Sequence, residues 1–268
     1  MTDERVLVIA PAALGRASWL VDAAGRRGLP VRAPDEVRPG QLCHYYGGPN
    51  FADRTAANLG IGLLEPPDSW LQHLPYAHTC RAVHHTKLAR VSRSGGPFFA
   101  KPPSSKDFPA SVYADGTELA AAADGLPPET PVLVSDIVQF AAEYRVFLLD
   151  GRAHTGSRYA VWGRLDPGPL DDDRIAARAE EVAGGLPSAV VVDVGLLGPP
   201  ENPRGSVAVV EANMAWFAQP YRSDPDRVLD VVLRAAGPVG EVADADRRYE
   251  RRPPGTAESR DRRPRPDA

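Results

Sequence analysis

The stretch FFAKP at residues 98–102 is an apolar run that ends on a lysine followed by proline. The run predicts a buried strand, and the proline predicts that the strand stops there. Of 31 basic residues only three are lysines, Lys87, Lys101 and Lys106, and they lie within twenty positions of one another. An ammonium group can reach a single phosphate oxygen, whereas a guanidinium suits a planar two-point partner. We therefore expect Lys101 to face an anion; an ordinary surface lysine at a strand end is the alternative.

Composition places the chain in a broad class. It has 268 residues and a formal net charge of −4, and it shows no basic helix with interleaved aromatic residues, so a nucleic-acid-binding protein is not expected. No apolar run approaches the length that crosses a membrane, and the acidic N-terminus leads into a strand-like run rather than a signal peptide. Cys43 and Cys80 match no metal-ligand spacing, which fits a reduced cytoplasmic protein.

Three segments and a tail follow from the order of apolar runs. Residues 1–75 alternate short strands with helices, which predicts a small α/β domain. No glycine fingerprint for a dinucleotide follows the first strand, at residues 6–10. Residues 76–135 and 136–238 are expected to form two further lobes. Residues 239–268 are rich in arginine, carboxylates and proline and are expected to be disordered.

The segment around Lys101 contains a predicted helix near residues 82–90 and a second apolar strand at residues 132–138. Ser135 and Asp136 interrupt that second strand. The loop PPSSK at residues 102–106 places two serines and Lys106 directly after Lys101. Such a loop can cover phosphates, or it can be an ordinary polar connection, and the spacing alone leaves both open.

A hairpin dominates the third segment. Residues 143–149 alternate with period two, Asp150-Gly151 is a strong two-residue turn signal, and residues 152–159 form the return strand. With an uninterrupted register, Arg145 and Arg158 lie together at the open end of this hairpin, roughly 5 Å apart. Two guanidiniums so close predict a bound anion between them. The alternative is a surface network in which Glu143 and Asp136 neutralise both arginines.

Oxygen donors gather on two later strands. Asp193 lies inside the apolar strand at residues 189–196, where a carboxylate is costly unless a cation meets it. Glu211 and Asn213 are two positions apart on the following strand, so they point the same way. This set of oxygens suits Mg²⁺. The acidic triplet at residues 171–173 is better explained as the first turn of a helix.

Five short motifs in this order resemble the ATP-grasp superfamily, and most closely its clade marked by two arginines and one lysine, whose members are mostly predicted amide ligases. The motifs are Phe99-Ala100-Lys101-Pro102, Glu143-Tyr144-Arg145, Ser157-Arg158-Tyr159, Asp193-Val194-Gly195 and Glu211-Ala212-Asn213. The resemblance covers residues 1–238. It implies a mixed α/β and α+β chain in which two lobes, residues 76–135 and 136–238, clasp ATP and a small Rossmann-like domain at residues 1–75 precedes them. Many ATP-grasp enzymes have a glycine-rich phosphate loop, and here residues 102–106 stand in its place.

The resemblance also implies a chemistry. A carboxylate attacks the γ-phosphate of ATP to give an acylphosphate, and an amine then displaces phosphate to form an amide or peptide bond. Lys101, Lys106, Ser135, Asp136 and Glu143 would bind the nucleotide, Asp193, Glu211 and Asn213 would hold Mg²⁺, and Arg145 and Arg158 would act on the transferred group. An ATP-grasp kinase and a non-catalytic nucleotide-binding module are the competing interpretations. The sequence leaves open which carboxylate and amine are used, whether either is a peptide, and the oligomeric state.

Overall fold

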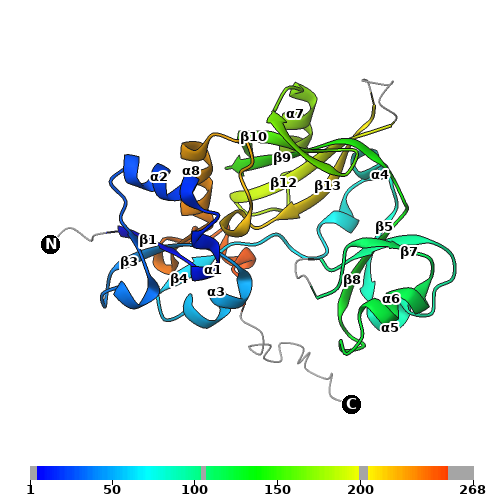
Figure 1. The fold of residues 1–268 in the computed structure, drawn as a ribbon, viewed down its shortest axis with the longest axis horizontal. Coiled ribbons are helices and arrows are strands. Elements are labelled where there is room, and N and C mark those ends of the chain that lie inside the picture. Colours follow the sequence, from blue (N-terminus) through cyan, green and yellow to red (C-terminus); the bar gives the residue numbers. More distant parts are fainter. Residues whose placement is uncertain (1–4, 104–106, 199–204, 253–268) are drawn as a thin grey trace, which may run out of the picture.

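The structure, a computed structural model, describes residues 5–103, 107–198 and 205–252. Its strands form a three-stranded sheet in the order β2-β1-β3, a four-stranded sheet β5-β8-β6-β7, a five-stranded sheet β11-β10-β9-β12-β13 and the pair β14-β4 (Figure 1). This mixture of helices, parallel strands and antiparallel strands is the α/β and α+β composition that the sequence predicts. None of the helices in the described ranges has the length and apolar character that crossing a membrane requires.

The first unit is built on a parallel sheet, as its alternation of strands and helices predicts. β1 pairs in parallel with both β2 and β3, and α2 covers the sheet with a buried face of leucine and alanine. The elements of this unit are β1 (Arg5–Ile9), α1 (Pro11–Leu14), α2 (Ser18–Arg26), β2 (Val31–Arg32), η1 (Pro34–Glu36), β3 (Leu42–Tyr46), α3 (Pro49–Thr55) and β4 (Ile61–Leu63).

The first lobe is an antiparallel sheet with two short helices beside it. Its elements are η2 (Leu71–His73), α4 (Tyr76–Thr79), β5 (Val83–Lys87), α5 (Leu88–Val91), β6 (Phe98–Lys101), β7 (Ser111–Tyr113), α6 (Gly116–Ala122) and β8 (Pro131–Ser135). The predicted strand that ends on Lys101 is present as β6. The helix predicted near residues 82–90 is wrong, because residues 83–87 pair with β8 instead and only residues 88–91 are helical. Pairing across the sheet outweighs the weak local helical pattern.

The second lobe carries the predicted hairpin and a continuous apolar strand. Its elements are β9 (Phe140–Leu149), β10 (Arg152–Val161), β11 (Arg164–Pro169), α7 (Asp173–Glu181), β12 (Ala189–Leu197), β13 (Val207–Asn213) and η3 (Ala215–Phe217). Asp150 and Gly151 both have positive φ, 50° and 74°, as a tight hairpin turn requires. The Asp172 side chain accepts a hydrogen bond from the Arg174 backbone and caps α7, which confirms that the acidic triplet marks a helix start.

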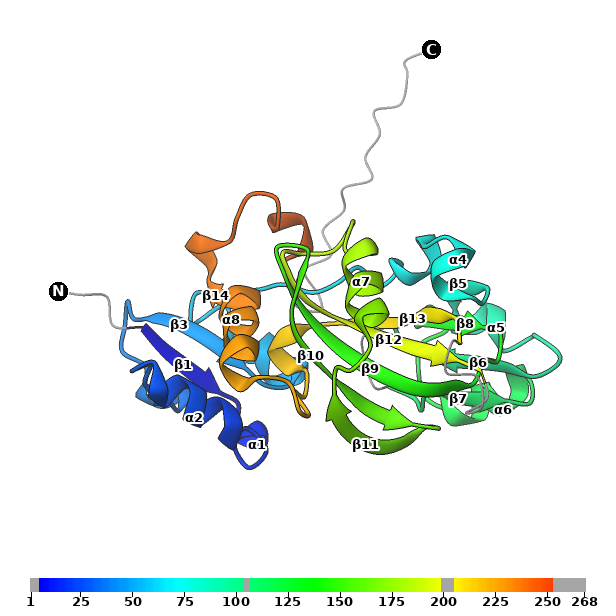
Figure 2. The ribbon, with the colours of Figure 1, turned by 90° about the horizontal axis from the view of Figure 1, so that it is seen from above.

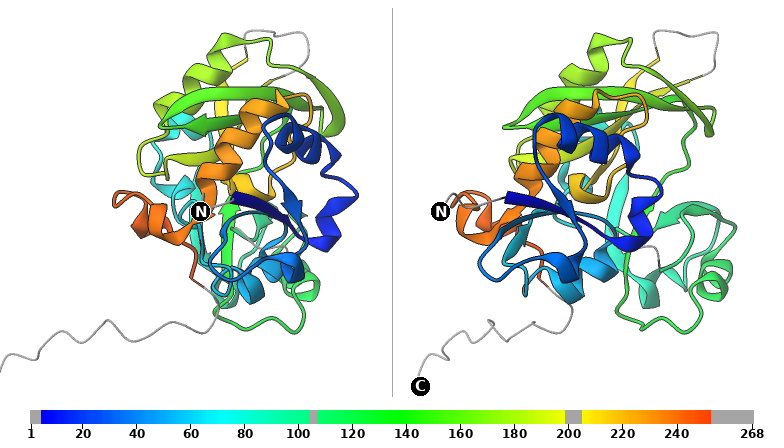
Figure 3. Two further views of the ribbon diagram at one scale, coloured as in Figure 1. Left: turned by 90° about the vertical axis from the view of Figure 1, so that its left-hand side faces the viewer. Right: turned by 60° about the vertical axis from the view of Figure 1, so that its left-hand side comes forward.

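Helices cover both faces of the five-stranded sheet, so its central strands are apolar on both sides. On one side, here called the α7 face, α7 packs on Val146, Val190 and Val192. On the other side, here called the cleft face, α8 (Pro225–Ala235) covers one end of the sheet. In Figure 2, α8 lies between the blue strands of the first unit and the green strands of the sheet. Figure 3 shows the same helix beside α2.

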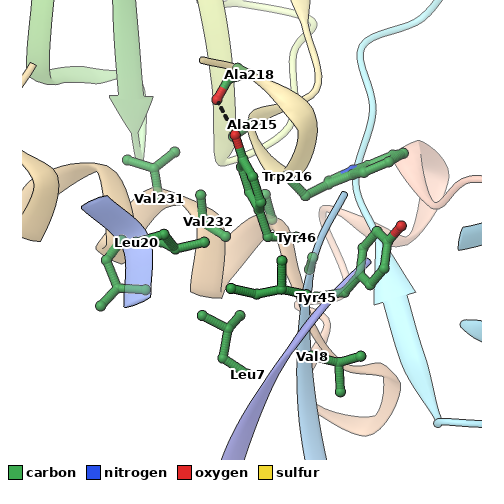
Figure 4. Close-up of a cluster of buried hydrophobic side chains, with 14 of the residues drawn as sticks. Leu7, Val8, Leu20, Tyr45, Tyr46, Ala215, Trp216, Ala218, Val231 and Val232 are labelled. Atoms are coloured by element: carbon green, nitrogen blue, oxygen red, sulfur yellow. Dashed lines mark hydrogen bonds between the residues drawn. The ribbon is translucent and has the colours of Figure 1, made fainter. Parts of the chain in front are cut away.

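A shared core joins the first unit to the second lobe. It contains Leu7 and Val8 of β1, Tyr46 of β3, Trp216 of η3 and the apolar side of α8 (Figure 4). The Tyr46 hydroxyl donates to the Ala218 backbone oxygen at 3.1 Å. The loop that follows β13 is therefore packed directly against the carboxyl end of the β3 strand.

The chain then returns to the first unit, which corrects the expectation of disorder for residues 239–252. β14 (Ala236–Pro238) pairs with β4, and η4 (Val239–Glu241) and η5 (Arg247–Tyr249) follow it. Arg251 forms ion pairs at 2.7 Å with both Asp53 and Glu65. Composition alone missed this, because a few buried anchors hold a largely polar segment in place. Residues 253–268 of the predicted tail lie outside the described residues.

Candidate active site

A cavity of about 440 Å³ lies between the four-stranded and five-stranded sheets. Phe99, Leu133, Ile137 and Phe140 contribute apolar walls, and the charged residues that line it are Arg81, Lys101, Asp136, Glu143 and Glu211. Largely apolar walls with a few convergent polar groups are typical of small-molecule sites. Both lobes therefore contribute to one candidate site.

Lys101 reaches across this cavity from the first lobe to the second. Its ammonium forms an ion pair with the Glu211 carboxylate, and the two side chains are 15% and 25% exposed. Burial lowers the pKa of Lys101 to about 8, while the nearby Asp193 carboxylate opposes that shift. The cation predicted to face a phosphate is thus neutralised here by a residue predicted to hold a metal.

The three predicted oxygen donors lie together. Asp193 of β12 is fully buried and stands opposite Glu211 of β13 in the strand register. The Asn213 amide donates to Glu211 at 2.7 Å and to Asp193 at 3.2 Å. Rotation of that amide would present its oxygen to the same point. Two carboxylates and one amide oxygen are the hard donors that Mg²⁺ takes, so the residues present fit that ion.

Arg145 is the cationic partner of the buried Asp193. Its Nε and Nη2 donate to the two carboxylate oxygens at 2.9 and 2.7 Å, a bidentate arrangement. Burial alone would lower the pKa of Arg145, but the Asp193 carboxylate outweighs it, so the guanidinium stays charged. This pair meets the expectation that a carboxylate inside so apolar a strand needs a cation.

Arg158 does not join Arg145, so the predicted arginine pair at the open end of the hairpin is wrong. The register of β9 and β10 shifts at His154, which adds one residue to β10. Such a shift turns every following side chain to the other face of the sheet. Ser157, not Arg158, therefore stands near Arg145, and Arg158 lies opposite Tyr144 on the α7 face.

Arg158 has carboxylate partners of its own on that face. It contacts Asp166 at 3.2 Å and Asp171 at 3.9 Å, and Asp171 also accepts from the Tyr144 hydroxyl. Neither Glu143 nor Asp136 is its partner among these contacts, so the alternative network that the sequence suggested is also different. The geometry gives Arg158 no access to the groups around Asp193.

The other predicted nucleotide-binding residues divide into three cases. Ser135 and Asp136 line the cavity, but the Asp136 carboxylate accepts from the Ala82 backbone at 2.8 Å and thereby ties β5 to β8. Glu143 also lines the cavity and accepts from the Tyr159 hydroxyl at 2.8 Å; burial raises the pKa of this carboxyl group. Lys106 lies outside the described residues.

Arg81 is a site residue that sequence reasoning missed. It is only 7% exposed and lines the cavity, and its guanidinium donates to the backbone oxygens of Val209 at 2.7 Å and Val210 at 2.9 Å. Burial lowers its pKa. No carboxylate bonds it within the described residues, so its positive charge is available to an anion. Arg81 belongs to no sequence motif, since the β13 carbonyls that hold it are far away in the chain.

Comparison with known proteins identifies the family. A family model for the ATP-grasp domain, the second family of the clade named for two arginines and one lysine, matches residues 78–231, more than half of the chain. The chain belongs to this ATP-grasp family. No curated protein sequence matches it.

Solved structures show the same fold at low identity. A RimK domain protein ATP-grasp from Sphaerobacter thermophilus is 15% identical over 85% of this chain and 97% of that one, with a TM-score of 0.54. The D-alanine–D-alanine ligase from Bacillus anthracis is 12% identical over 86% of this chain and 96% of its own, with a TM-score of 0.57. The ATP-grasp ligase PsnB complexed with a minimal precursor is 13% identical over 87% and 99%, with a TM-score of 0.50. At these identities the likeness concerns the fold, and it confirms the predicted ATP-grasp architecture.

Proposed function

We propose that this chain is an ATP- and Mg²⁺-dependent carboxylate–amine ligase that forms an amide or peptide bond through an acylphosphate. One observation carries the proposal: Lys101, Glu211, Asp193 and Arg145 form a continuous set of charges at one end of an apolar cavity, in a chain of the ATP-grasp family. A set of buried charges that neutralise one another suits a ligand carrying both phosphates and a metal ion.

The nucleotide end of the site rests on two cations from the first lobe. Lys101 and Arg81 line the same cavity as the apolar side chains of Phe99 and Ile137. The base would occupy the apolar part, and the phosphates would replace Glu211 as the partner of Lys101. Three backbone oxygens already orient Arg81, so its guanidinium needs little further ordering to meet a phosphate.

Asp193, Glu211 and Asn213 would hold the metal ion. When bound, Mg²⁺ supplies charge that neutralises the phosphates during transfer. The protein's part is to bring the three oxygens to one point, and the antiparallel pairing of β12 with β13 does this. Glu211 would exchange its ion pair with Lys101 for the metal as the phosphates arrive.

Arg145 would act on the transferred phosphoryl group or the acylphosphate. A guanidinium has five N–H donors, and three of those of Arg145 bond Asp193 and the Gln219 backbone oxygen in the described residues. A fixed positive charge at a site where negative charge develops lowers the barrier without reorganisation. Arg158 loses its proposed catalytic role, because it lies on the α7 face.

The substrates would be a small-molecule or peptide carboxylate and an amine, in the cytoplasm. The names of the solved relatives include both kinds: one acts between two alanines, and one was studied with a precursor. The identities of the two substrates stay open for this chain.

The test is ADP formation by the full chain with ATP, Mg²⁺ and panels of carboxylates and amines. A ligase forms ADP only when both substrates are present, and mass spectrometry finds the condensed product. ADP formation with a single hydroxyl or carboxylate acceptor and a phosphorylated product would indicate a kinase instead. Nucleotide binding with no turnover of any pair would contradict the ligase.

A further inference from the structure

A short loop, residues 219–223, meets Arg145 at two points. The Gln219 backbone oxygen accepts from Nη1 of Arg145 at 3.4 Å, and the centre of the Tyr221 ring lies 5.3 Å from the guanidinium carbon. The Tyr159 ring lies 5.6 Å from the same carbon and stacks on Tyr221 with an interplanar angle of 18°. Arg145 thus has Asp193 along one edge and an aromatic pair beside it, which restricts the orientation of its planar group.

The backbone of Tyr221 is strained. Its φ is 53°, in the left-handed region that glycine, asparagine and aspartate adopt far more readily than a bulky residue. Strained positions of this kind persist where the surroundings over-determine them, and they cluster at functional sites. A tyrosine here implies that its ring is needed where the strain puts it.

Ser157 provides the surroundings that hold the loop. Its hydroxyl is fully buried and donates to the Pro220 oxygen at 3.2 Å, while the Arg222 backbone and the Ser223 hydroxyl each donate to it at 3.3 Å. One donor and two acceptor positions exhaust the bonding capacity of a hydroxyl. Ser157 is also the residue opposite Arg145 in the register of β10 and β9. The residue that anchors the loop therefore stands beside the arginine that the loop contacts.

We infer that Tyr221 is a positioning residue for Arg145, and that the Ser157 hydroxyl holds it in place. The ring restricts the guanidinium so that its two remaining N–H groups point at the reacting oxygen instead of turning with the side chain. The inference rests on the proposed function only for its catalytic consequence. The positioning itself is a property of the free protein.

The first measurement is therefore independent of catalysis. In the full chain labelled with ¹⁵N-arginine, the Arg145 Nε–H signal is assigned by its loss in Arg145→Lys. Tyr221→Gly removes the ring and also relieves the backbone strain, so we expect it to fold at least as stably as the parent. Its Arg145 Nε–H should nevertheless exchange with water at least tenfold faster. Tyr221→Phe, which keeps the ring, should leave the exchange unchanged. Equal exchange in the parent and Tyr221→Gly would overturn the inference.

The second measurement follows ADP formation from ATP and Mg²⁺. Misorientation of a group by about 1 Å can cost on the order of a hundredfold in rate, so Tyr221→Gly should lose tenfold to a hundredfold in kcat with the KM for ATP within about twofold. Tyr221→Phe should retain the rate, and Ser157→Ala should lose it in part. Tyr76→Ala, at a tyrosine that is 68% exposed, is the control. Faster exchange with an unchanged rate in Arg145→Lys would refute the proposed role of Arg145 while the positioning stands. A rate loss shared by Tyr221→Phe would overturn positioning by the ring.

Discussion

The two faces of the five-stranded sheet each carry one arginine from the same hairpin, and the two arginines have different surroundings. On the cleft face the Arg145 side chain is 12% exposed and its partner Asp193 is 1% exposed. On the α7 face Arg158 is 24% exposed, and its partners Asp166 and Asp171 are about half exposed. An exposed ion pair contributes little because water screens it, whereas a buried pair is costly to break. The burial of the carboxylate, more than the arginine itself, marks the functional face.

Removal of the buried carboxylate should have the largest effect. Asp193→Asn leaves Arg145 buried with an uncompensated charge and removes a proposed metal ligand. Breaking a buried pair costs roughly 3–5 kcal/mol, so the melting temperature should fall by about ten degrees, and ADP formation should be lost. Asp171→Asn on the α7 face is the matched control and should melt within a few degrees of the parent. Equal losses in calorimetric scans of the two variants would mean that the faces do not differ.

Arg145→Met separates the catalytic role of the cleft face from nucleotide binding. The variant keeps the aliphatic bulk, and Lys101 and Arg81 remain to meet the phosphates. The loss of one preorganised charge that acts in the transition state costs about 10²–10³ in rate. Affinity for ATP with Mg²⁺, measured by calorimetry, should change by less than about threefold. A variant that turns over normally would place Arg145 among purely structural residues.

Lys101→Met tests the cation that reaches the cleft face from the other lobe. A charge-assisted contact to phosphate contributes roughly 1.5–3 kcal/mol, so affinity for ATP with Mg²⁺ should fall about tenfold to a hundredfold. Lys101→Arg should restore little, because a planar fork does not suit a point-charge position. Lys87→Met, at an exposed lysine paired with Glu129, is the control. Calorimetry showing equal affinity in all three variants would remove Lys101 from the site.

The sequence predicted the residues that act within one strand or between neighbouring strands. The spacing of Glu211 and Asn213 followed from the two-residue period of a strand, and the apolar run around Asp193 required a cation. The β6 strand ending at Lys101 followed in the same way from an apolar run and a proline. In each case local periodicity carried the information.

Features that depend on register or on distant contacts were beyond the sequence. The extra residue at His154 moved Arg158 to the other face, and no composition signal marks such a bulge. Arg81 is held by carbonyls of β13, about 130 positions away in the chain. Arg251 orders the C-terminal segment through Asp53 and Glu65, which lie in and just after the first unit. These contacts exist only once the chain has folded.

The pH dependence of nucleotide binding gives a smaller effect. Because burial lowers the pKa of Lys101 to about 8, the free protein loses this positive charge as pH rises through 8. Phosphates bind the protonated form, so above pH 8 binding must take up a proton, and affinity should fall about tenfold between pH 7.5 and pH 9. Calorimetry in buffers of different ionisation enthalpy measures this uptake. Lys101→Met should show no such fall; a fall of equal size in that variant would assign the titration to another group.

The smallest effect is expected at Arg158, and it completes the comparison of the two faces. Arg158→Met removes half-exposed ion pairs on the α7 face that contribute about 0–1 kcal/mol, so the melting temperature should drop by no more than roughly 2–4 °C. Nucleotide affinity and the rate of ADP formation should both stay within twofold of the parent, because the register keeps this side chain away from Asp193. Measured beside Arg145→Met, the variant asks whether two arginines of one hairpin differ as their faces do. A tenfold or greater loss of rate in Arg158→Met, with normal melting, would mean that the hairpin changes register when substrates bind and that Arg158 then reaches the cleft.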